Sequence, residues 1–206
     1  SPTDPNANTL ENMHQQLLMG FASADNGAAA SAATGALQSL PGDYAPMLCV
    51  NKWVDYTSKY GLGYLFSDGS SGVYFNDSSK IILSANGQNL EYMERVSRRS
   101  NNGVVPEPRR DCFTLDNYSP DLQKKVTLLK HFRNYLVEQQ AKSGEPLLND
   151  PTAPAREMVY LKKWVKTRHA VLFRLSNRTV QVNFFDHTEI LLSSEARLVT
   201  YVDRQK

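Results

Sequence analysis

The chain has 206 residues, enough for one large domain or two small ones that each bury a hydrophobic core. Its 23 basic and 21 acidic residues give a formal net charge of +2, which excludes a strongly basic nucleic-acid binder and an acidic tail protein. The two cysteines, Cys49 and Cys112, form no CxxC motif and have no histidine at metal spacing, so neither a disulfide framework nor a metal site is predicted. No apolar run is long enough to span a membrane, and we expect a soluble intracellular protein.

The N-terminal part is predicted to contain one short helix between two segments without a core. Residues 1–8 are polar and hold two prolines, which predicts a flexible lead. Residues 9–20 fit a helix because apolar residues such as Leu10 and Leu17 recur at helical spacing. Residues 21–46 are rich in Ala, Ser and Gly and are predicted to be a linker.

From residue 47 onward the sequence predicts an antiparallel sheet followed by a helix. Aromatic and β-branched residues are interrupted by two turn segments, 67–70 and 76–79, which is typical of short strands in a meander. Residues 95–120 are polar and predicted to form a loop, and we interpret their arginines as solvated rather than as an anion-binding surface. Residues 121–142 fit an amphipathic helix.

An internal repeat relates two parts of the chain. Residues 64–93 align with residues 173–202 at a constant offset of 109, so that turn residues match turn residues and apolar residues match apolar ones. Trp53 also matches Trp164 once two residues are inserted in the first copy. The first copy continues into a further strand and the helix, whereas the chain ends soon after the second. The repeat therefore predicts two units of one strand-rich fold, the second lacking its last strand and helix.

Five segments of the sequence resemble a known family. KWVDYTSKYGLGY (residues 52–64) and GVYFNDSS (72–79) resemble the first polo box of polo-like kinases, and KKVTLLKHFRNYL (124–136) resembles the helix that follows it. VQVNFFDHT (180–188) resembles the second polo box, and the helix at 9–20 resembles the polo cap. The similarity points to the mitotic subgroup of the family.

This resemblance implies an α+β fold. Each polo box would be a six-stranded antiparallel sheet with one helix, and the two boxes would pack together with a cleft between them. Polo box 1 is expected over residues 47–145, a connecting loop over 146–157, and an incomplete polo box 2 over 158–206.

The resemblance also implies a binding function. Polo boxes of this kind bind phosphoserine or phosphothreonine peptides with Ser before the phosphorylated residue and Pro after it. This binding docks a serine/threonine kinase on primed phosphorylated partners, and the polo boxes inhibit their own kinase domain until a ligand binds. The expected locations are the cytoplasm and nucleus, with centrosomes and kinetochores in mitosis.

The same resemblance leaves the chain without an expected catalytic activity. The kinase signatures, a Gly-rich nucleotide loop, HRD and DFG, do not occur in it. No cofactor, metal, nucleic acid or membrane is expected as a ligand. The alternative function is a phosphate-independent interaction or dimerisation scaffold.

The expected phosphate site centres on His187. The family has a histidine here and a lysine two residues later, and such a pair makes charge-assisted hydrogen bonds to a phosphate dianion. This chain has Glu189 at the lysine position, and a carboxylate repels a phosphate at short range. Three alternatives stay open: phosphate binding is lost, another cation such as Lys166 or Arg168 replaces the lysine, or a phosphate-independent surface is used. An alternative interpretation of His187 is that it only ends a hairpin turn and contacts no ligand.

Further cleft residues are implied by the resemblance. Trp53 matches a tryptophan that packs on the serine before the phosphorylated residue, although a core role fits it too. Asp55 and Phe185 are expected beside the cleft. Gln140 and Ala141 stand where the family has a leucine pair that contacts the peptide through its backbone. A second, aromatic groove is implied by residues that would fit a plain core equally well: Val54, Tyr56, Tyr60, Leu128, His131, Phe132 and Tyr135.

Overall fold

The computed structural model describes residues 48–100, 103–144, 146–147, 158–193 and 198–202. All of these residues belong to one compact unit, Pro46–Lys206. The predicted lead, the helix expected at 9–20 and the whole linker at 21–46 are among the residues 1–47 that lie outside the description. Within the described ranges, no helix has both the length and the apolar character needed to cross a membrane.

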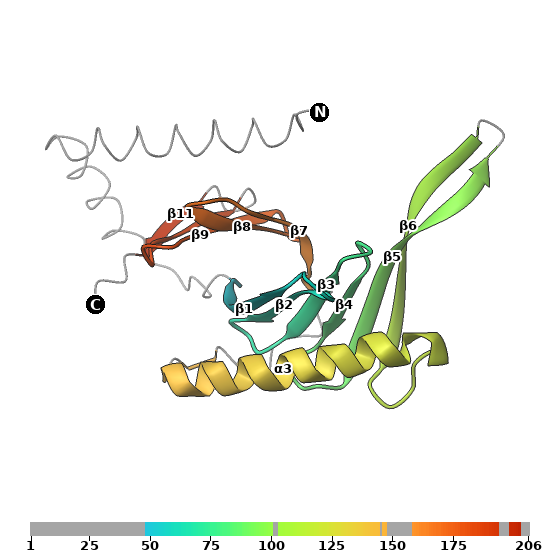
Figure 1. Cartoon of the computed structure of the whole chain (residues 1–206), viewed down its shortest axis with the longest axis horizontal. Coiled ribbons are helices and arrows are strands. Elements are labelled where there is room, and N and C mark those ends of the chain that lie inside the picture. The colour runs from blue at the N-terminus through green and yellow to red at the C-terminus, as the bar shows by residue number, and fades with distance from the viewer. Residues whose placement is uncertain (1–47, 101–102, 145, 148–157, 194–197, 203–206) are drawn as a thin grey trace, which may run out of the picture. The chain divides into compact units, whose positions relative to one another are not determined.

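The first sheet has six antiparallel strands arranged in sequence order, as predicted for the first unit. They are β1 (Val50–Tyr56), β2 (Gly61–Phe66), β3 (Ser71–Phe75), β4 (Lys80–Leu83), β5 (Asn89–Ser100) and β6 (Gly103–Thr114). A short 3-10 turn, η1 (Pro120–Leu122), leads into α3 (Gln123–Ser143), which lies along one face of this sheet (Figure 1). The helix ends at Gly144, whose left-handed backbone (φ 70°) suits a residue without a Cβ.

Apolar side chains hold α3 on the first sheet. Val126, Leu129 and Phe132 recur at helical spacing and are buried against strand residues such as Val73 and Ile81. This face of the sheet and this face of the helix therefore form one core, which explains why residues 121–142 read as amphipathic.

The second sheet has five antiparallel strands in the described residues. They are β7 (Leu161–Lys166), β8 (Ala170–Leu175), β9 (Thr179–Phe184), β10 (Glu189–Ser193) and β11 (Leu198–Val202). In the described ranges no helix follows the last of these strands. Five strands, against six strands and a helix in the first unit, agree with the prediction that the second unit is shorter.

The repeat seen in the sequence is reproduced by the backbone. The first residues of β2 and β8 are 109 positions apart, and so are their last residues. The first residues of β4 and β10 are separated by the same 109 positions. β1 and β7 each contain a β-bulge, between Val50 and Lys52 in one and between Leu161 and Lys163 in the other. The two units are thus equivalent down to an irregularity of their first strands.

The two sheets share one hydrophobic core. Tyr64 and Phe66 from β2 pack in the same buried cluster as Phe173 and Leu175 from β8. Polar contacts cross this core as well, because the Leu161 N–H donates a hydrogen bond to Tyr64 Oη at 3.1 Å. The shared core places the first strand of each unit against the sheet of the other.

The prediction of a loop over residues 95–120 is wrong. β5 and β6 pair along twelve residues each and form a long hairpin that runs past the other strands (Figure 1). The prediction rested on the polar composition of the segment. Pro106 and Pro108 nevertheless lie within β6, although proline normally interrupts a sheet. β6 is an edge strand, and the two prolines are two residues apart and so lie on the same side of it. An edge strand tolerates missing N–H groups that face away from the sheet.

Two arginines of this hairpin are engaged within the fold. Arg109 Nε lies 2.8 Å from Asp111 Oδ2. Arg110 donates from Nε to Glu91 Oε2 at 2.7 Å, and its guanidinium lies 5.6 Å from the centre of the Tyr160 ring. These contacts stabilise the base of the hairpin and differ from the solvated loop that the sequence predicts.

Candidate functional site

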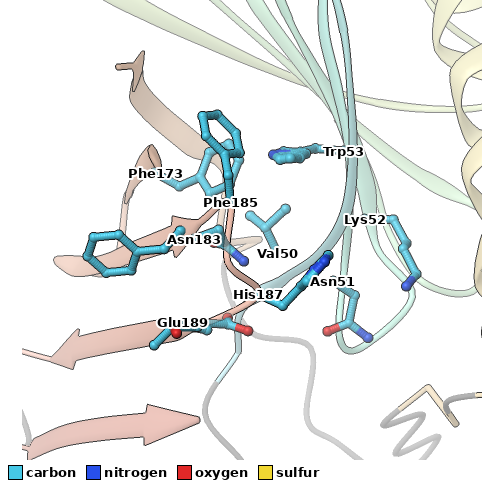
Figure 2. Close-up of a pocket in the computed structure, with 11 residues that line it drawn as sticks. Val50, Asn51, Lys52, Trp53, Phe173, Asn183, Phe185, His187 and Glu189 are labelled. Carbon is cyan, nitrogen blue, oxygen red and sulfur yellow. The ribbon is translucent and has the colours of Figure 1, made fainter. Parts of the chain in front are cut away.

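A pocket of about 270 Å³ lies between β1 of the first sheet and the β9–β10 turn of the second. Four consecutive residues, Val50 to Trp53, form the first wall, and residues 183–189 supply most of the second. Phe173 of β8 adds an aromatic ring (Figure 2). Because the walls come from different sheets, the shared core sets the width of the pocket.

The β9–β10 turn carries His187 in a left-handed backbone conformation (φ 74°). The turn is closed by the Phe184 N–H, which donates to Thr188 O at 2.9 Å, and by the Thr188 N–H, which donates to Asp186 Oδ1 at 2.9 Å. The second hydrogen bond holds the pKa of Asp186 below its ordinary value. The side chain of His187 is exposed and lines the pocket (Figure 2). A residue with a Cβ is strained in this conformation, and such strain is often found at functional positions.

Glu189 lines the same pocket but its carboxyl is directed to a buried amide. Its exposed fraction is 6%, and Gln181 Nε2 donates a hydrogen bond to Glu189 Oε1 at 2.6 Å. Gln181 is fully buried and also binds the backbone of Val50 through two hydrogen bonds. Glu189 is therefore part of the pocket floor.

Trp53 has two roles in the geometry. Its ring is half-buried, packs on the shared core and meets Phe173 edge to face, with ring centres 5.9 Å apart. The same ring lines the pocket. The Trp53 side chain therefore packs on the core and also lines the pocket, the two places between which the sequence did not decide.

The polar lining of the pocket can accept as well as donate hydrogen bonds. Asn183 Oδ1 is buried in the wall, and it has no hydrogen-bond donor among the residues that the structure describes. A ligand N–H is the kind of group that this oxygen can accept from. In the part of the chain that is described, no three His, Cys, Asp or Glu side chains come together as metal ligands would.

Comparison with protein families decides the identity of the repeat. A family model described as the POLO box duplicated region matches residues 58–126 and 167–206, which together are more than half of the chain. The chain belongs to the polo-box family. The first sheet with α3 is polo box 1, and the second sheet is polo box 2.

Curated relatives of this chain are protein kinases. A probable serine/threonine-protein kinase CCRP1 of Zea mays is 48% identical over 157 residues, which are 76% of this chain and 24% of the maize protein. Serine/threonine-protein kinase PLK1 of Xenopus tropicalis is 41% identical over 162 residues, 78% of this chain and 25% of the frog protein. The chain thus spans about a quarter of the length of these kinases.

Solved polo-box domains have a similar fold. The budding yeast Cdc5 polo-box domain in complex with Spc72 phosphopeptide has a TM-score of 0.60 at 27% identity, covering 80% of this chain and 57% of the yeast chain. The same yeast domain in complex with the Dbf4 polo-interacting region has a TM-score of 0.54 at 25% identity, covering 81% and 59%.

The structure brings four of the expected cleft residues into the pocket. Trp53 comes from polo box 1, and Phe185, His187 and Glu189 come from polo box 2. Phe185 is 48% exposed, which is unusual for a phenylalanine and leaves its ring free to contact a ligand.

The other expected cleft residues do not line the pocket. Lys166 Nζ lies 3.1 Å from Asp55 Oδ2, so these two form an ion pair between β7 and β1. A hydrogen bond from the Thr57 hydroxyl, supported by Lys166, holds the pKa of Asp55 below its ordinary value. Gln140 and Ala141 lie in the last turns of α3 and are absent from the lining. Arg168, the other candidate substitute for the family lysine, donates to His169 Nε2 at 2.7 Å.

The residues of the expected aromatic groove divide into two sets. Phe132 is buried in the core beneath α3, and Val54 and Leu128 pack against that core. Tyr56, Tyr60 and Tyr135 are exposed, and the first two meet edge to face with ring centres 5.5 Å apart. His131 is exposed on α3.

The sequence did not identify Lys52 as a pocket residue. In a regular strand, Lys52 and Trp53 would point to opposite faces. Lys52 and Trp53 pair regularly with β2, and their side chains leave β1 on opposite sides, although both residues line the pocket (Figure 2). Lys52 stands beside Trp53 in the motif that carries the family resemblance, but no local signal shows that it borders a pocket formed with the other sheet. The sequence also missed Asn51, Asn183 and Thr188, because their place in the pocket lining depends on contacts between the two sheets.

Proposed function

We propose that this chain is a phosphopeptide-binding module whose ligand occupies the pocket between polo box 1 and polo box 2. The observation that carries the proposal is that Trp53, Phe185 and His187 meet in one pocket although they come from two boxes. The yeast polo-box domain that binds Spc72 phosphopeptide supports it, since that domain has a similar fold. The ligand class is a peptide with Ser before the phosphorylated Ser or Thr and Pro after it.

Each pocket residue has a chemical task in this proposal. The exposed imidazole of His187 donates to the phosphate, most strongly in its doubly protonated form. Lys52 adds a second basic group to the same lining, in place of the lysine that the family has at position 189. Trp53 and Phe185 provide apolar walls for the residues next to the phosphate, and Asn183 Oδ1 accepts a backbone N–H.

Fluorescence polarisation tests this function with the full 206-residue chain. The probes are a labelled peptide containing Ser-pThr-Pro and its unphosphorylated twin. We expect the phosphorylated peptide to bind more tightly and the His187→Ala variant to lose that preference. Ser78→Ala is the matched control, because Ser78 is the repeat equivalent of His187 and has a similar backbone (φ 67°) outside the pocket. Equal affinities of wild type for the two peptides would sink the proposal.

A phosphate-independent interaction scaffold is the second candidate function. The observation in its favour is Glu189, an acidic residue that lines the pocket two residues from His187. A carboxylate about 4 Å from a phosphate costs on the order of 1 kcal/mol even in water. Sedimentation that shows a concentration-dependent dimer without peptide, together with equal binding of both peptides, would support this candidate over the first.

The role of the module in a larger protein follows from its relatives. We propose that it docks a serine/threonine kinase on primed phosphorylated proteins and inhibits the kinase domain until a ligand binds, because its relatives are kinases about three times its length. Centrosomes and kinetochores are the proposed destinations. Fluorescence microscopy of the tagged chain and its His187→Ala variant in dividing cells tests the targeting.

A further inference from the structure

Gln181 connects the two polo boxes at the floor of the pocket. Its Oε1 accepts a hydrogen bond from the Val50 N–H at 2.7 Å, and its Nε2 donates to Val50 O at 2.8 Å. The remaining hydrogen of Nε2 is directed to Glu189 Oε1 at 2.6 Å. One fully buried side chain therefore binds both backbone groups of a residue 131 positions away and is itself held by Glu189.

The two residues that Gln181 binds, Val50 and Glu189, both line the pocket. Val50 begins β1, the strand that carries Trp53, and both residues line the pocket. Glu189 begins β10, directly after the turn that carries His187. The contacts from Glu189 through Gln181 to Val50 thus join the wall that holds Trp53 to the wall that holds His187.

The equivalent positions of polo box 1 carry neither the amide nor the carboxyl. An offset of 109 places Gln181 over Gly72 and Glu189 over Lys80. In polo box 1, where the first position has no side chain to orient, the second carries a lysine that donates to Ser78 O at 3.1 Å. In polo box 2, where the first position is an amide, the second is a buried carboxyl that binds the amide.

We propose that Glu189 is a positioning residue that fixes the Gln181 amide and thereby sets the distance between Trp53 and His187. Without Glu189, the amide loses one partner and can rotate away from Val50, which widens the pocket floor. The departure from the family lysine then replaces a direct contact to the ligand phosphate with control of the pocket width. This inference rests on the proposed function, because its effect is read as peptide affinity.

A pair of neutral variants isolates the hydrogen bond from the charge. Glu189→Gln keeps an oxygen that can accept from Gln181, whereas Glu189→Leu has none. Both remove the repulsion between carboxylate and phosphate, so charge alone predicts equal affinities for the Ser-pThr-Pro peptide. We expect Glu189→Gln to bind at least as tightly as wild type and Glu189→Leu to bind about tenfold more weakly than Glu189→Gln.

Tyr64→Phe is the matched control for loss of a contact between the boxes. It removes the hydroxyl that accepts the Leu161 N–H, a buried hydrogen bond between two residues that do not themselves line the pocket. We expect its peptide affinity to match that of wild type. Gln181→Leu removes the contact at the pocket floor and is expected to weaken binding as much as Glu189→Leu does.

Amide hydrogen exchange of the ligand-free protein gives a readout that does not depend on binding. Under conditions in which it exchanges through local opening, the Val50 amide should exchange faster in Glu189→Leu and Gln181→Leu, and at the wild-type rate in Glu189→Gln and Tyr64→Phe. Equal affinities and equal Val50 exchange in Glu189→Leu and Glu189→Gln would overturn the inference. If Glu189→Leu does not fold, Glu189→Asp keeps the charge but withdraws the acceptor, and wild-type affinity in that variant overturns the inference equally.

These measurements separate the inference from the proposed function. If wild type binds both peptides equally, the proposed function fails, and Val50 exchange still tests whether Glu189 orients Gln181. If wild type prefers the phosphopeptide but the two neutral variants do not differ, the function stands and the positioning role of Glu189 is wrong.

Discussion

Each polo box supplies a buried polar side chain that accepts a backbone hydrogen bond from the other box, but the two side chains differ in type and in position within the repeat. From polo box 1, the Tyr64 hydroxyl crosses over Gly72 and accepts the N–H of Leu161. From polo box 2, where the equivalent residues are Phe173 and Gln181, the amide of Gln181 accepts the N–H of Val50. A repeat can therefore keep a contact between its copies while exchanging which strand supplies the polar group.

The β-turns that follow these positions differ in what they face. In polo box 1, the turn residues Asp77 and Ser79 are bound by Lys125 of α3, at 2.8 Å and 2.6 Å. In polo box 2, the equivalent turn faces the pocket, and its Asp186 binds Thr188 within the turn. One copy of the turn is attached to a helix, and the other is available to a ligand.

Gly72→Ala tests the contact from polo box 1 and is expected to have the largest effect on stability. A Cβ at this position would overlap the Tyr64 hydroxyl and lie 2.8 Å from Ile81 O. The ring of Tyr64 would have to move and give up its hydrogen bond to Leu161. We expect a loss of about 3 kcal/mol or more in the free energy of unfolding, measured by chemical denaturation. A loss below about 1 kcal/mol would show that the core accommodates the methyl group.

Tyr64→Phe tests the same contact without overcrowding the core. Burial raises the pKa of Tyr64, so the hydroxyl keeps its proton over the range in which the protein is studied. Its removal leaves the buried Leu161 N–H without this acceptor, and we expect a loss of about 1–3 kcal/mol in the free energy of unfolding. Chemical denaturation of the two variants should rank Gly72→Ala as the less stable. The reverse ranking would contradict our account of Gly72.

Lys125→Met tests the attachment of the first turn to α3. Burial alone would lower the pKa of Lys125, but hydrogen bonds to Asp77 and Tyr92 outweigh it and raise the pKa. Burial alone would raise the pKa of Asp77, but hydrogen bonds from Lys125 and Ser79 outweigh it and lower that pKa. Because the Asp77 side chain is 58% exposed and therefore screened, we expect a loss of about 1 kcal/mol near neutral pH.

The pH dependence of this loss has a definite sign. A lowered Asp77 pKa contributes stability above the ordinary aspartate pKa of about 4, and this contribution disappears as the pH falls through the folded-state value. A raised Lys125 pKa contributes stability below the ordinary lysine pKa of about 10.4, and this contribution disappears as the pH rises through the folded-state value. Melting curves of wild type and Lys125→Met should therefore differ at pH 5–9 and converge in acid below about pH 4. A constant difference down to pH 2 would show that the ion pair is not its cause.

The sequence predicts the parts of this fold that depend on local pattern. Helical spacing predicts residues 121–142, and α3 spans Gln123–Ser143. The repeat predicts the second sheet from the first, because turn residues and strand residues match at one offset. The family resemblance places Trp53, Phe185 and His187 at the cleft, and the structure brings them to one pocket.

The parts that sequence could not predict depend on contacts between distant residues or on an irregular backbone. Gln181 binds Val50 across 131 positions, and no local pattern marks that pair. Asn51 is the extra residue of the β-bulge between Val50 and Lys52 and lines the pocket, but no local signal in the sequence marks the bulge. The edge position of β6 makes two prolines compatible with a strand, and that position is fixed by the whole sheet.

Ser78→Gly and His187→Gly separate backbone strain from function, with the smallest expected effect on stability. The two residues occupy equivalent turns with φ of 67° and 74°, a region that costs a residue with a Cβ roughly 1–2 kcal/mol and glycine almost nothing. Glycine also loses more backbone entropy on folding, so we expect each variant to gain no more than about 0.5–1 kcal/mol in the free energy of unfolding.

Chemical denaturation measures the gain, and polarisation with the Ser-pThr-Pro peptide measures the function. His187→Gly should lose the preference for phosphopeptide while Ser78→Gly keeps it, which would show that the same strain serves ligand binding in one copy and only turn formation in the other. Loss of the preference in both variants would mean that turn geometry, and not the imidazole, controls binding.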